Sequence, residues 1–224
     1  MWVFFLACTQ QAKDSGGDDS NTLPVSNTYT ADIRLMDAAD GSPLFEAILL
    51  GDQNTEDVLT NESGEGQTSV SENYTIKMSL DGYTDHYYQG RTSEDFEIIA
   101  LLASDAFATQ IYSMLGLGLD ASKGTLIVAL DEADLSPAIG ASATIDGNMS
   151  QAFVIGATGP SFGTVITGNG SSIVSFPNLD SGDYTINTIN SNGVACTVFP
   201  NGGDAAQQIS VRSSAVTVAV YTCP

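Results

Sequence analysis

Alternating apolar and polar residues mark short strands along most of the chain after residue 28. Residues 29–36 and 74–80 alternate with a period of two, which places successive side chains on opposite faces of a strand. Residues 125–130 are almost wholly apolar, as expected of a strand buried on both faces. Clusters of Gly, Pro, Asp and Asn separate these segments and indicate turns. Further strands are predicted at 45–50, 58–60, 67–70, 142–145, 153–155, 172–176, 184–189, 194–198 and 215–221.

One segment, residues 104–116, departs from the strand pattern. Ser104 is a suitable N-cap, and Phe107, Ile111 and Leu115 recur every four residues. Gly116 follows as a suitable C-terminal cap. The pattern predicts one short helix at the junction between the two halves of the chain.

The two halves repeat the same order of features. Each begins with a strand, followed by an acidic turn that ends in proline, at 37–43 and again at 131–137. A later strand begins Tyr-Thr-Ile in both halves, at Tyr74 and at Tyr184. We therefore expect an all-β protein with two Ig-like or transthyretin-like Greek-key β-sandwich domains in tandem. The expected boundaries are 29–103 for the first sandwich, 104–120 for the helix and linker, and 121–224 for the second sandwich.

The first eight residues resemble the end of a bacterial lipoprotein signal peptide. Phe5-Leu6-Ala7-Cys8 resembles a lipobox, in which the cysteine receives the lipid and becomes the mature N-terminus, although Phe5 replaces the usual leucine. Seven apolar residues are too few to cross a bilayer, which takes about 20. We therefore expect residues 1–8 to be a truncated signal whose true start lies upstream. The alternative is an ordinary thiol at Cys8.

Residues 9–28 are polar and rich in Gly, Ser and Asp, which predicts a disordered tether with a mean reach of roughly 25 Å. Such a tether would let a lipid-anchored domain stand clear of the membrane. In Gram-negative lipoproteins, which this segment resembles, an Asp directly after the lipidated cysteine tends to retain the protein at the inner membrane. Thr9 occupies that position here, which favours the outer membrane. The expected location is the cell envelope, anchored to the outer membrane and facing the periplasm or the exterior.

Three cysteines are present, and lipidation of Cys8 would leave Cys196 and Cys223 free to pair. A disulfide between them would close about 27 residues and would hold the last strand to the body of its domain. The alternative is a pair of buried thiols, which an oxidising compartment disfavours.

Two segments of the second half resemble carboxypeptidase regulatory-like domains, a transthyretin-like β-sandwich class. The more specific is Phe176-Pro-Asn-Leu-Asp-Ser-Gly-Asp-Tyr184, and residues 137–145 supply a second match. The first half carries thinner matches at 41–44 and 80–83. The resemblance implies a β-sandwich with Tyr184 in its core and a role in adhesion, spacing or ligand binding. It implies no catalytic activity.

The charge balance disfavours nucleic acid as a partner. The chain carries 27 acidic and 6 basic residues, for a formal net charge of −21, and such a polyanion repels phosphate.

His86 is the single histidine, so a Ser-His-Asp triad or a histidine-containing zinc site would need it. Its position beside Asp85 and a turn predicts an ordinary surface histidine. We expect no enzyme.

Acidic residues at corresponding turns, Asp37 and Asp40 in the first half and Asp131 and Asp134 in the second, are candidate calcium ligands. Calcium takes six to eight oxygen ligands, and no EF-hand motif is present. The favoured interpretation is an acidic rim that is exposed to solvent and binds no cofactor. Calcium is the alternative, and it is the one cofactor that the sequence suggests.

Tyr83, Tyr87 and Tyr88 cluster after a turn and could form a patch that binds sugar or protein. The favoured alternative places them alternately in the core and on the surface of an edge strand.

Together these features predict a non-enzymatic, surface-anchored lipoprotein that serves as a structural or interaction module. The alternatives are a carbohydrate- or calcium-dependent adhesion module and a cryptic hydrolase. The expected partners are the membrane, through the lipid, and a surface protein or a carbohydrate.

Overall fold

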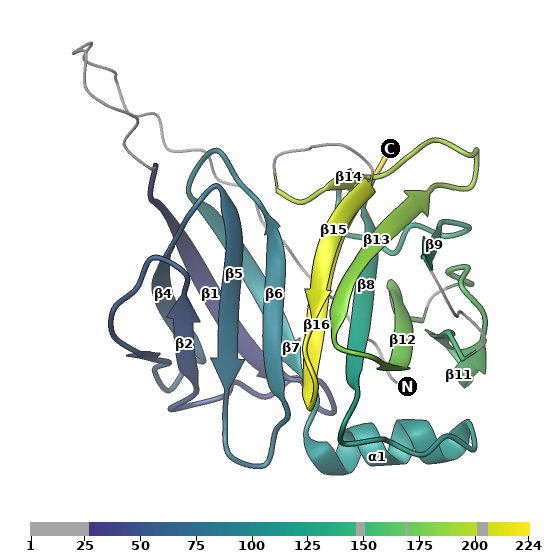
Figure 1. Ribbon diagram of the computed structural model, residues 1–224, viewed down its shortest axis with the longest axis horizontal. Coiled ribbons are helices and arrows are strands. Elements are labelled where there is room, and N and C mark those ends of the chain that lie inside the picture. Colours follow the sequence, from purple (N-terminus) through teal and green to yellow (C-terminus); the bar gives the residue numbers. More distant parts are fainter. Residues whose placement is uncertain (1–26, 147–150, 169, 201–205) are drawn as a thin grey trace.

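The computed structural model describes residues 27–146, 151–168, 170–200 and 206–224, and these form sixteen strands and one helix (Figure 1). The prediction of two tandem β-sandwiches with one short helix is confirmed. The first half contains β1 (Tyr29–Asp37), β2 (Ile48–Gly51), β3 (Val58–Leu59), β4 (Glu65–Val70), β5 (Asn73–Ser79), β6 (Asp85–Arg91) and β7 (Phe96–Leu102). The second half contains β8 (Gly124–Glu132), β9 (Ser142–Ile145), β10 (Phe153–Gly156), β11 (Gly159–Phe162), β12 (Ile173–Leu179), β13 (Gly182–Ile189), β14 (Thr197–Val198), β15 (Ala206–Val211) and β16 (Ala215–Cys223).

The N-terminal sandwich packs the sheet β4-β1-β7 against the strands β3-β2-β5-β6. Strand β1 runs antiparallel to β4 and parallel to β7. Alternate residues of β1 are buried because they face the opposing sheet, while the residues between them face solvent. Fully buried side chains from both sheets meet in one core, among them Ile33, Leu35, Leu49, Ile76 and Ile98.

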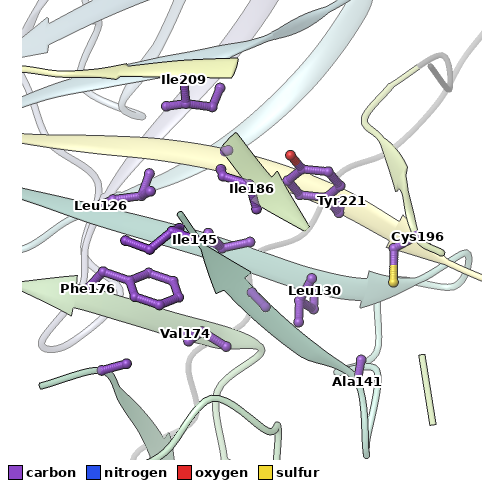
Figure 2. Packing of buried hydrophobic residues seen from close by; sticks show 14 of the residues in the cluster. Leu126, Leu130, Ala141, Ile145, Val174, Phe176, Ile186, Cys196, Ile209 and Tyr221 are labelled. Carbon is purple, nitrogen blue, oxygen red and sulfur yellow. The ribbon is translucent and has the colours of Figure 1, made fainter. Parts of the chain in front are cut away.

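The C-terminal sandwich packs the sheet β15-β13-β9 against β12-β8-β16. Figure 2 shows its core, in which Leu126 and Leu130 of β8 lie among side chains from the facing strands. Burying these apolar groups away from water supplies the main stabilising free energy of the sandwich. The other labelled members are Ala141, Ile145, Val174, Phe176, Ile186, Cys196, Ile209 and Tyr221.

The two sandwiches share one topology. In the second half β12-β8-β16 takes the place of β4-β1-β7, and β9-β13-β15 takes the place of β2-β5-β6. The turns after β1 and β8 correspond in detail, since Asp40 and Asp134 each accept a hydrogen bond from the backbone N–H of a serine two residues later. The repeated acidic turns in the sequence therefore mark the same corner of each sandwich.

The helix α1 (Asp105–Met114) connects the sandwiches and agrees with the predicted segment. The Ser104 hydroxyl accepts a hydrogen bond from the Phe107 N–H at 3.3 Å, as an N-cap does. At the other end Gly116 adopts φ 68°, and the Leu117 N–H donates to the Tyr112 carbonyl at 2.9 Å. Across the described ranges, the structure contains no helix with the length and apolar character needed to span a membrane.

A seam of backbone hydrogen bonds joins the sandwiches directly. Strand β6 of the first pairs in parallel with β16 of the second, from Asp85 opposite Ala215 to Gln89 opposite Ala219. The two strands lie side by side at the centre of the molecule (Figure 1). One sheet therefore continues through both halves in the order β11-β10-β12-β8-β16-β6-β5-β2-β3.

The partner sheets cover opposite faces of this continuous sheet. The face that carries Tyr88 and Val218 packs against β4-β1-β7, and the face that carries Leu126 packs against β15-β13-β9. The first of these faces continues under α1, where Tyr112 meets Phe153 of β10 edge-on at 5.7 Å between ring centroids. The helix thus covers the part of this face that β4-β1-β7 does not reach.

Candidate functional site

A cavity of about 390 Å³ lies on this face, between the continuous sheet, α1 and the end of β7. The strand register explains which side chains form its floor. His86, Val216 and Thr125 stand at one level of β6, β16 and β8, and Tyr88, Val218 and Ile127 stand at the next level. Because side chains two residues apart share a face, all six point to the same side of the sheet. Each of these six residues lines the cavity.

The helix α1 and its flanking segments cover the cavity on the side opposite the sheet. Phe107, Ala108, Ile111 and Tyr112 of α1 line it, and Leu101 of β7 forms part of one wall. Most of the lining is apolar, so the walls favour an apolar occupant.

A few polar groups interrupt the apolar lining. The hydroxyl oxygens of Tyr112 and Thr125 lie 2.9 Å apart in a hydrogen bond, and burial raises the pKa of the Tyr112 hydroxyl. Ser171, Ser172 and Ser175 add hydroxyl groups on the β12 side. The site therefore combines apolar walls with a small number of hydrogen-bonding groups.

His86 is the most unusual of these polar residues, because only 1% of its surface is exposed. Its Nδ1 lies 2.8 Å from the carbonyl oxygen of Thr84, which can only accept, so Nδ1 carries the proton and Nε2 is left as an acceptor. Burial lowers the pKa of the imidazole to about 4, so the ring is neutral at pH 7.

The prediction of a surface histidine at this position is therefore wrong. The neighbouring Asp85 points to the other face of β6 and pairs with Lys77 at 2.8 Å. Side chains alternate along a strand, so a residue adjacent in sequence to an exposed carboxylate is directed into the interior. A catalytic triad would need the Asp85 carboxylate to orient the His86 ring. The two side chains lie on opposite faces of β6, so they cannot act together in this way.

The charged residues that line the cavity are Asp105, Asp120 and Lys123. Both aspartates are exposed, and the Asp105 carboxylate accepts a hydrogen bond from the Thr84 hydroxyl at 2.7 Å. Lys123 is paired with Asp180. The rim is consequently acidic.

The predicted tyrosine patch does not form, and that prediction is wrong. Tyr88 is buried in the core of the first sandwich, whereas Tyr87 points to the opposite face of β6, beneath the Arg212 guanidinium at 4.3 Å. Tyr83 is half-buried and its hydroxyl donates to the Asp37 carboxylate. The cause is the period of two along β6, which separates residues adjacent in sequence. The favoured alternative is correct in the alternation of Tyr87 and Tyr88, but β6 is not the expected edge strand, because it pairs with both β5 and β16.

The four candidate calcium ligands lie at two separate corners: Asp37 ends β1 and Asp131 lies near the end of β8, and Asp40 and Asp134 lie in the turns that follow. Asp37 and Asp40 accept hydrogen bonds from the backbone of their own turn, and Asp134 does the same in the second. Asp131 is 4% exposed, and burial raises the pKa of its carboxyl to about 7. Among the described residues, no three His, Cys, Asp or Glu side chains gather as a metal site would need. Calcium binding stays a prediction.

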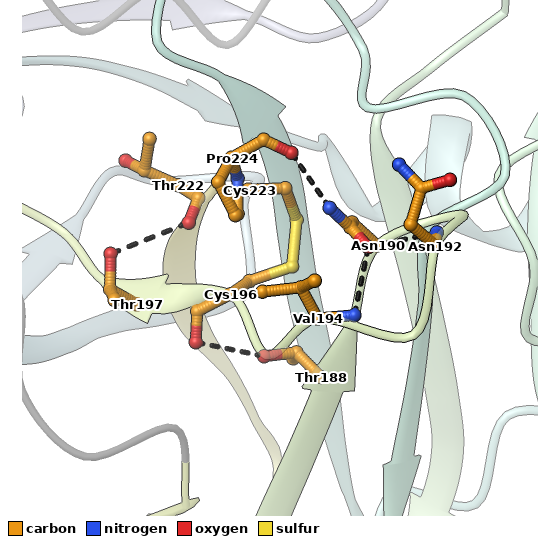
Figure 3. The surroundings of a disulfide bond; sticks show 9 residues. All are labelled: Thr188, Asn190, Asn192, Val194, Cys196, Thr197, Thr222, Cys223 and Pro224. Carbon is orange, nitrogen blue, oxygen red and sulfur yellow. Dashed lines mark hydrogen bonds between the residues drawn. A yellow bond between two sulfur atoms is a disulfide. The ribbon is translucent and has the colours of Figure 1, made fainter.

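The predicted disulfide is confirmed. Cys196 and Cys223 are bonded, which ties the segment before β14 to the end of β16 (Figure 3). Asn190 reinforces this corner by donating from its side chain to the Pro224 carbonyl oxygen at 2.7 Å. Tyr184 was expected in the core, and it is half-buried with its hydroxyl donating to the Asp180 carbonyl oxygen at 2.9 Å. Cys8 and most of the expected tether lie outside the described residues.

Sequence reasoning missed the cavity. The signal available was the near-continuous apolar character of β8, which requires cover on both faces, while only one face is covered by the second sandwich itself.

No protein-family model and no curated protein matches the chain, so the resemblance to carboxypeptidase regulatory-like domains stays a prediction. Among solved structures, a minor pilin of Streptococcus agalactiae, GBS52, is 13% identical and has a TM-score of 0.30, with 87% of this chain and 95% of that chain covered.

A streptococcal ancillary pilin is 13% identical with a TM-score of 0.26, and the Bacillus anthracis TIE protein is 15% identical with a TM-score of 0.25. In both comparisons 87% of this chain is covered, which spans 62% of the ancillary pilin and 34% of the TIE protein. At TM-scores this low, the similarity supports no inference about the function of this chain.

Proposed function

We propose that this protein is a non-enzymatic structural module of the cell envelope, held at a membrane by a lipid on Cys8. Its two sandwiches would act as one rigid spacer that carries an interaction surface away from the membrane. The observation that carries this proposal is the parallel pairing of β6 with β16, because one hydrogen-bonded sheet passes through both halves. Relative motion of the halves would require those bonds to break.

Side chains on both faces of the seam support a rigid arrangement. The Gln89 side chain makes two hydrogen bonds with the backbone of Ser210, and Arg212 covers the ring of Tyr87. On the other face, Val218 belongs to the same core as Tyr88 of the first sandwich. Interfaces between domains that move are usually small and polar, whereas this one includes a shared apolar core.

The surroundings of the single histidine support a non-enzymatic role. His86 is neutral at pH 7, and its Nδ1 proton is engaged by a backbone carbonyl. A catalytic histidine needs an adjacent nucleophile and an orienting carboxylate, and Asp85 faces the other side of the strand.

An envelope location is supported by the disulfide between Cys196 and Cys223, since such bonds form and persist in oxidising compartments. The Phe5-Leu6-Ala7-Cys8 segment supports anchorage by lipid.

Two experiments test the proposal. With the protein expressed from its own locus, labelled palmitate should enter the wild type and not Cys8→Ser, and Cys8→Ser should leave the membrane fraction. Equal labelling of both proteins would contradict the lipid anchor. For rigidity, residual dipolar couplings of soluble Cys8→Ser should give one alignment tensor for both halves, whereas two different tensors would contradict the spacer.

A further inference from the structure

We propose that the cavity beneath α1 binds a small uncharged molecule with an apolar body and one hydroxyl group, such as a phenol or a long-chain alcohol. The site lies where the two sandwiches and the helix meet, and it is separate from the anchoring function proposed above. Four features of the cavity indicate such a ligand: its volume, its apolar walls, the acceptor nitrogen of His86 and the charge of its rim.

The volume and the walls set the apolar body of the ligand. At about 390 Å³ the cavity falls within the roughly 300–1,000 Å³ typical of small-molecule sites. Its floor is built from Val216, Val218 and Ile127, and Phe107 and Ile111 line it from the helix. An aromatic or aliphatic group seated there would be removed from water on most of its surface, which favours binding.

The acceptor that selects a hydroxyl group is Nε2 of His86. Because Nδ1 donates to the Thr84 carbonyl oxygen, the ring is held in the tautomer that leaves Nε2 with a lone pair. The side chain is 99% buried and lines the cavity, and Nδ1 is occupied by the Thr84 carbonyl oxygen. Nε2 is therefore the ring nitrogen that can accept, and a ligand hydroxyl directed at it would gain a hydrogen bond away from bulk water.

Charge excludes ionised ligands of either sign. Asp105 and Asp120 at the rim and the net charge of −21 repel anions, and Lys123 is already paired with Asp180. A cation could pair with Asp105 or Asp120 only at the exposed rim, because the other described lining residues carry no carboxylate. Burying an unpaired charge costs more free energy than apolar contacts with the cavity walls would contribute.

The test uses three naphthalenes of similar size and isothermal titration calorimetry on the full chain carrying Cys8→Ser. We expect saturable binding of one molecule of 2-naphthol per chain. The affinity for 2-methoxynaphthalene should be lower by about tenfold or more, and naphthalene-2-carboxylate should show no measurable binding at pH 7. Equal affinity for all three probes, or no saturable binding of 2-naphthol, would overturn the proposal.

Matched variants locate the site. Ala108→Phe places a ring in the cavity and should abolish binding, whereas Ala106→Phe, on an exposed position of the same helix that does not line the cavity, should leave it unchanged. Equal binding to the two variants would show that the probe binds elsewhere and would refute the site.

A third variant tests the acceptor. His86→Asn keeps a donor near the position of Nδ1 and removes Nε2, so it should lower the affinity for 2-naphthol to that for 2-methoxynaphthalene. His86→Gln places an amide near the position of Nε2 and should retain part of the preference. If His86→Asn keeps the full preference, the hydroxyl does not reach His86. The Ala108→Phe and Ala106→Phe pair still decides the site if either His86 variant fails to fold.

Discussion

Gln89 and Ser210 lie 121 residues apart in sequence and are joined by two hydrogen bonds across the seam between the sandwiches. The Gln89 Nε2 donates to the Ser210 carbonyl oxygen at 2.8 Å, and the Ser210 N–H donates to Gln89 Oε1 at 3.1 Å. The side-chain amide thus pairs with a backbone amide as a neighbouring strand would. It attaches β6 of the first sandwich to β15, which belongs to the second sheet of the other sandwich.

Gln89→Ala should therefore lower the free energy of unfolding by about 1–2 kcal/mol, because two hydrogen bonds are lost and the Ser210 amide is left without its partner. Urea denaturation measures the change. Gln53→Ala is the control, since Gln53 is exposed and no hydrogen bond from its side chain is described, and it should change stability by less than about 0.5 kcal/mol. An equal effect of the two substitutions would show that the seam contact contributes nothing.

Replacement of both Cys196 and Cys223 by serine should lower the free energy of unfolding by about 3.5 kcal/mol. The disulfide closes a separation of 27 residues, so its loss enlarges the ensemble of the unfolded chain. Guanidinium denaturation of the wild type with and without reductant should show the same difference, and the double variant should not respond to reductant. A wild type that is equally stable in both conditions would contradict this prediction.

Asp131 should make the protein less stable as pH rises from about 4 to about 7. Burial raises the pKa of its carboxyl to about 7, so the folded state holds this proton more tightly than the unfolded state does. The stability from the neutral carboxyl is fully present below pH 4 and is lost as pH rises through 7. Asp131→Asn should remove this loss and raise stability at pH 8 by on the order of 2 to 4 kcal/mol.

The control for Asp131 is Asp134→Asn, in the turn that follows β8. Its exposed carboxyl has a lowered pKa because Ser136 donates to it from both its hydroxyl and its backbone N–H. Asn can accept the same bonds, so this variant should not stabilise the protein at pH 8. Thermal unfolding at pH 5, 6.5 and 8 measures both variants, and a pH-independent effect of Asp131→Asn would contradict the assignment.

His86 should produce the opposite slope. Burial lowers the pKa of the imidazole from 6.5 to about 4, so the unfolded state binds a proton more readily in this range. The stability contributed by the neutral ring is present above pH 6.5 and is lost as pH falls through 4. The difference in unfolding free energy between the wild type and His86→Asn should therefore shrink by on the order of 3 kcal/mol between pH 6.5 and pH 4. A constant difference would place His86 in solvent.

Ser104→Ala should destabilise the protein by about 1 kcal/mol, because the Phe107 N–H loses its capping partner. Ser113→Ala, near the other end of the same helix and exposed, is the control and should be neutral or slightly stabilising, since alanine has the higher helix propensity. Urea denaturation distinguishes them. Identical stabilities of the two variants would contradict the capping role of Ser104.

Local features of this protein can be predicted from the amino-acid sequence. The period of two predicts strands such as β1 and β5, and Ser104 with Gly116 predicts both ends of α1. The repeated turns at Asp40 and Asp134 were recognisable because an aspartate that accepts from a backbone N–H two residues later is a local interaction. The Cys196–Cys223 bond followed from counting cysteines.

The seam and the cavity depend on how distant segments meet in space, so they become visible only in the folded protein. Parallel pairing of β6 with β16 joins residues about 130 positions apart through backbone groups that every strand edge offers, so no side-chain pattern specifies it. The burial of His86 depended on which face of β6 was covered, and Tyr87 and Tyr88 were separated for the same reason. The cavity exists because the helix covers a face that neither partner sheet reaches, and this follows from how three elements meet in space.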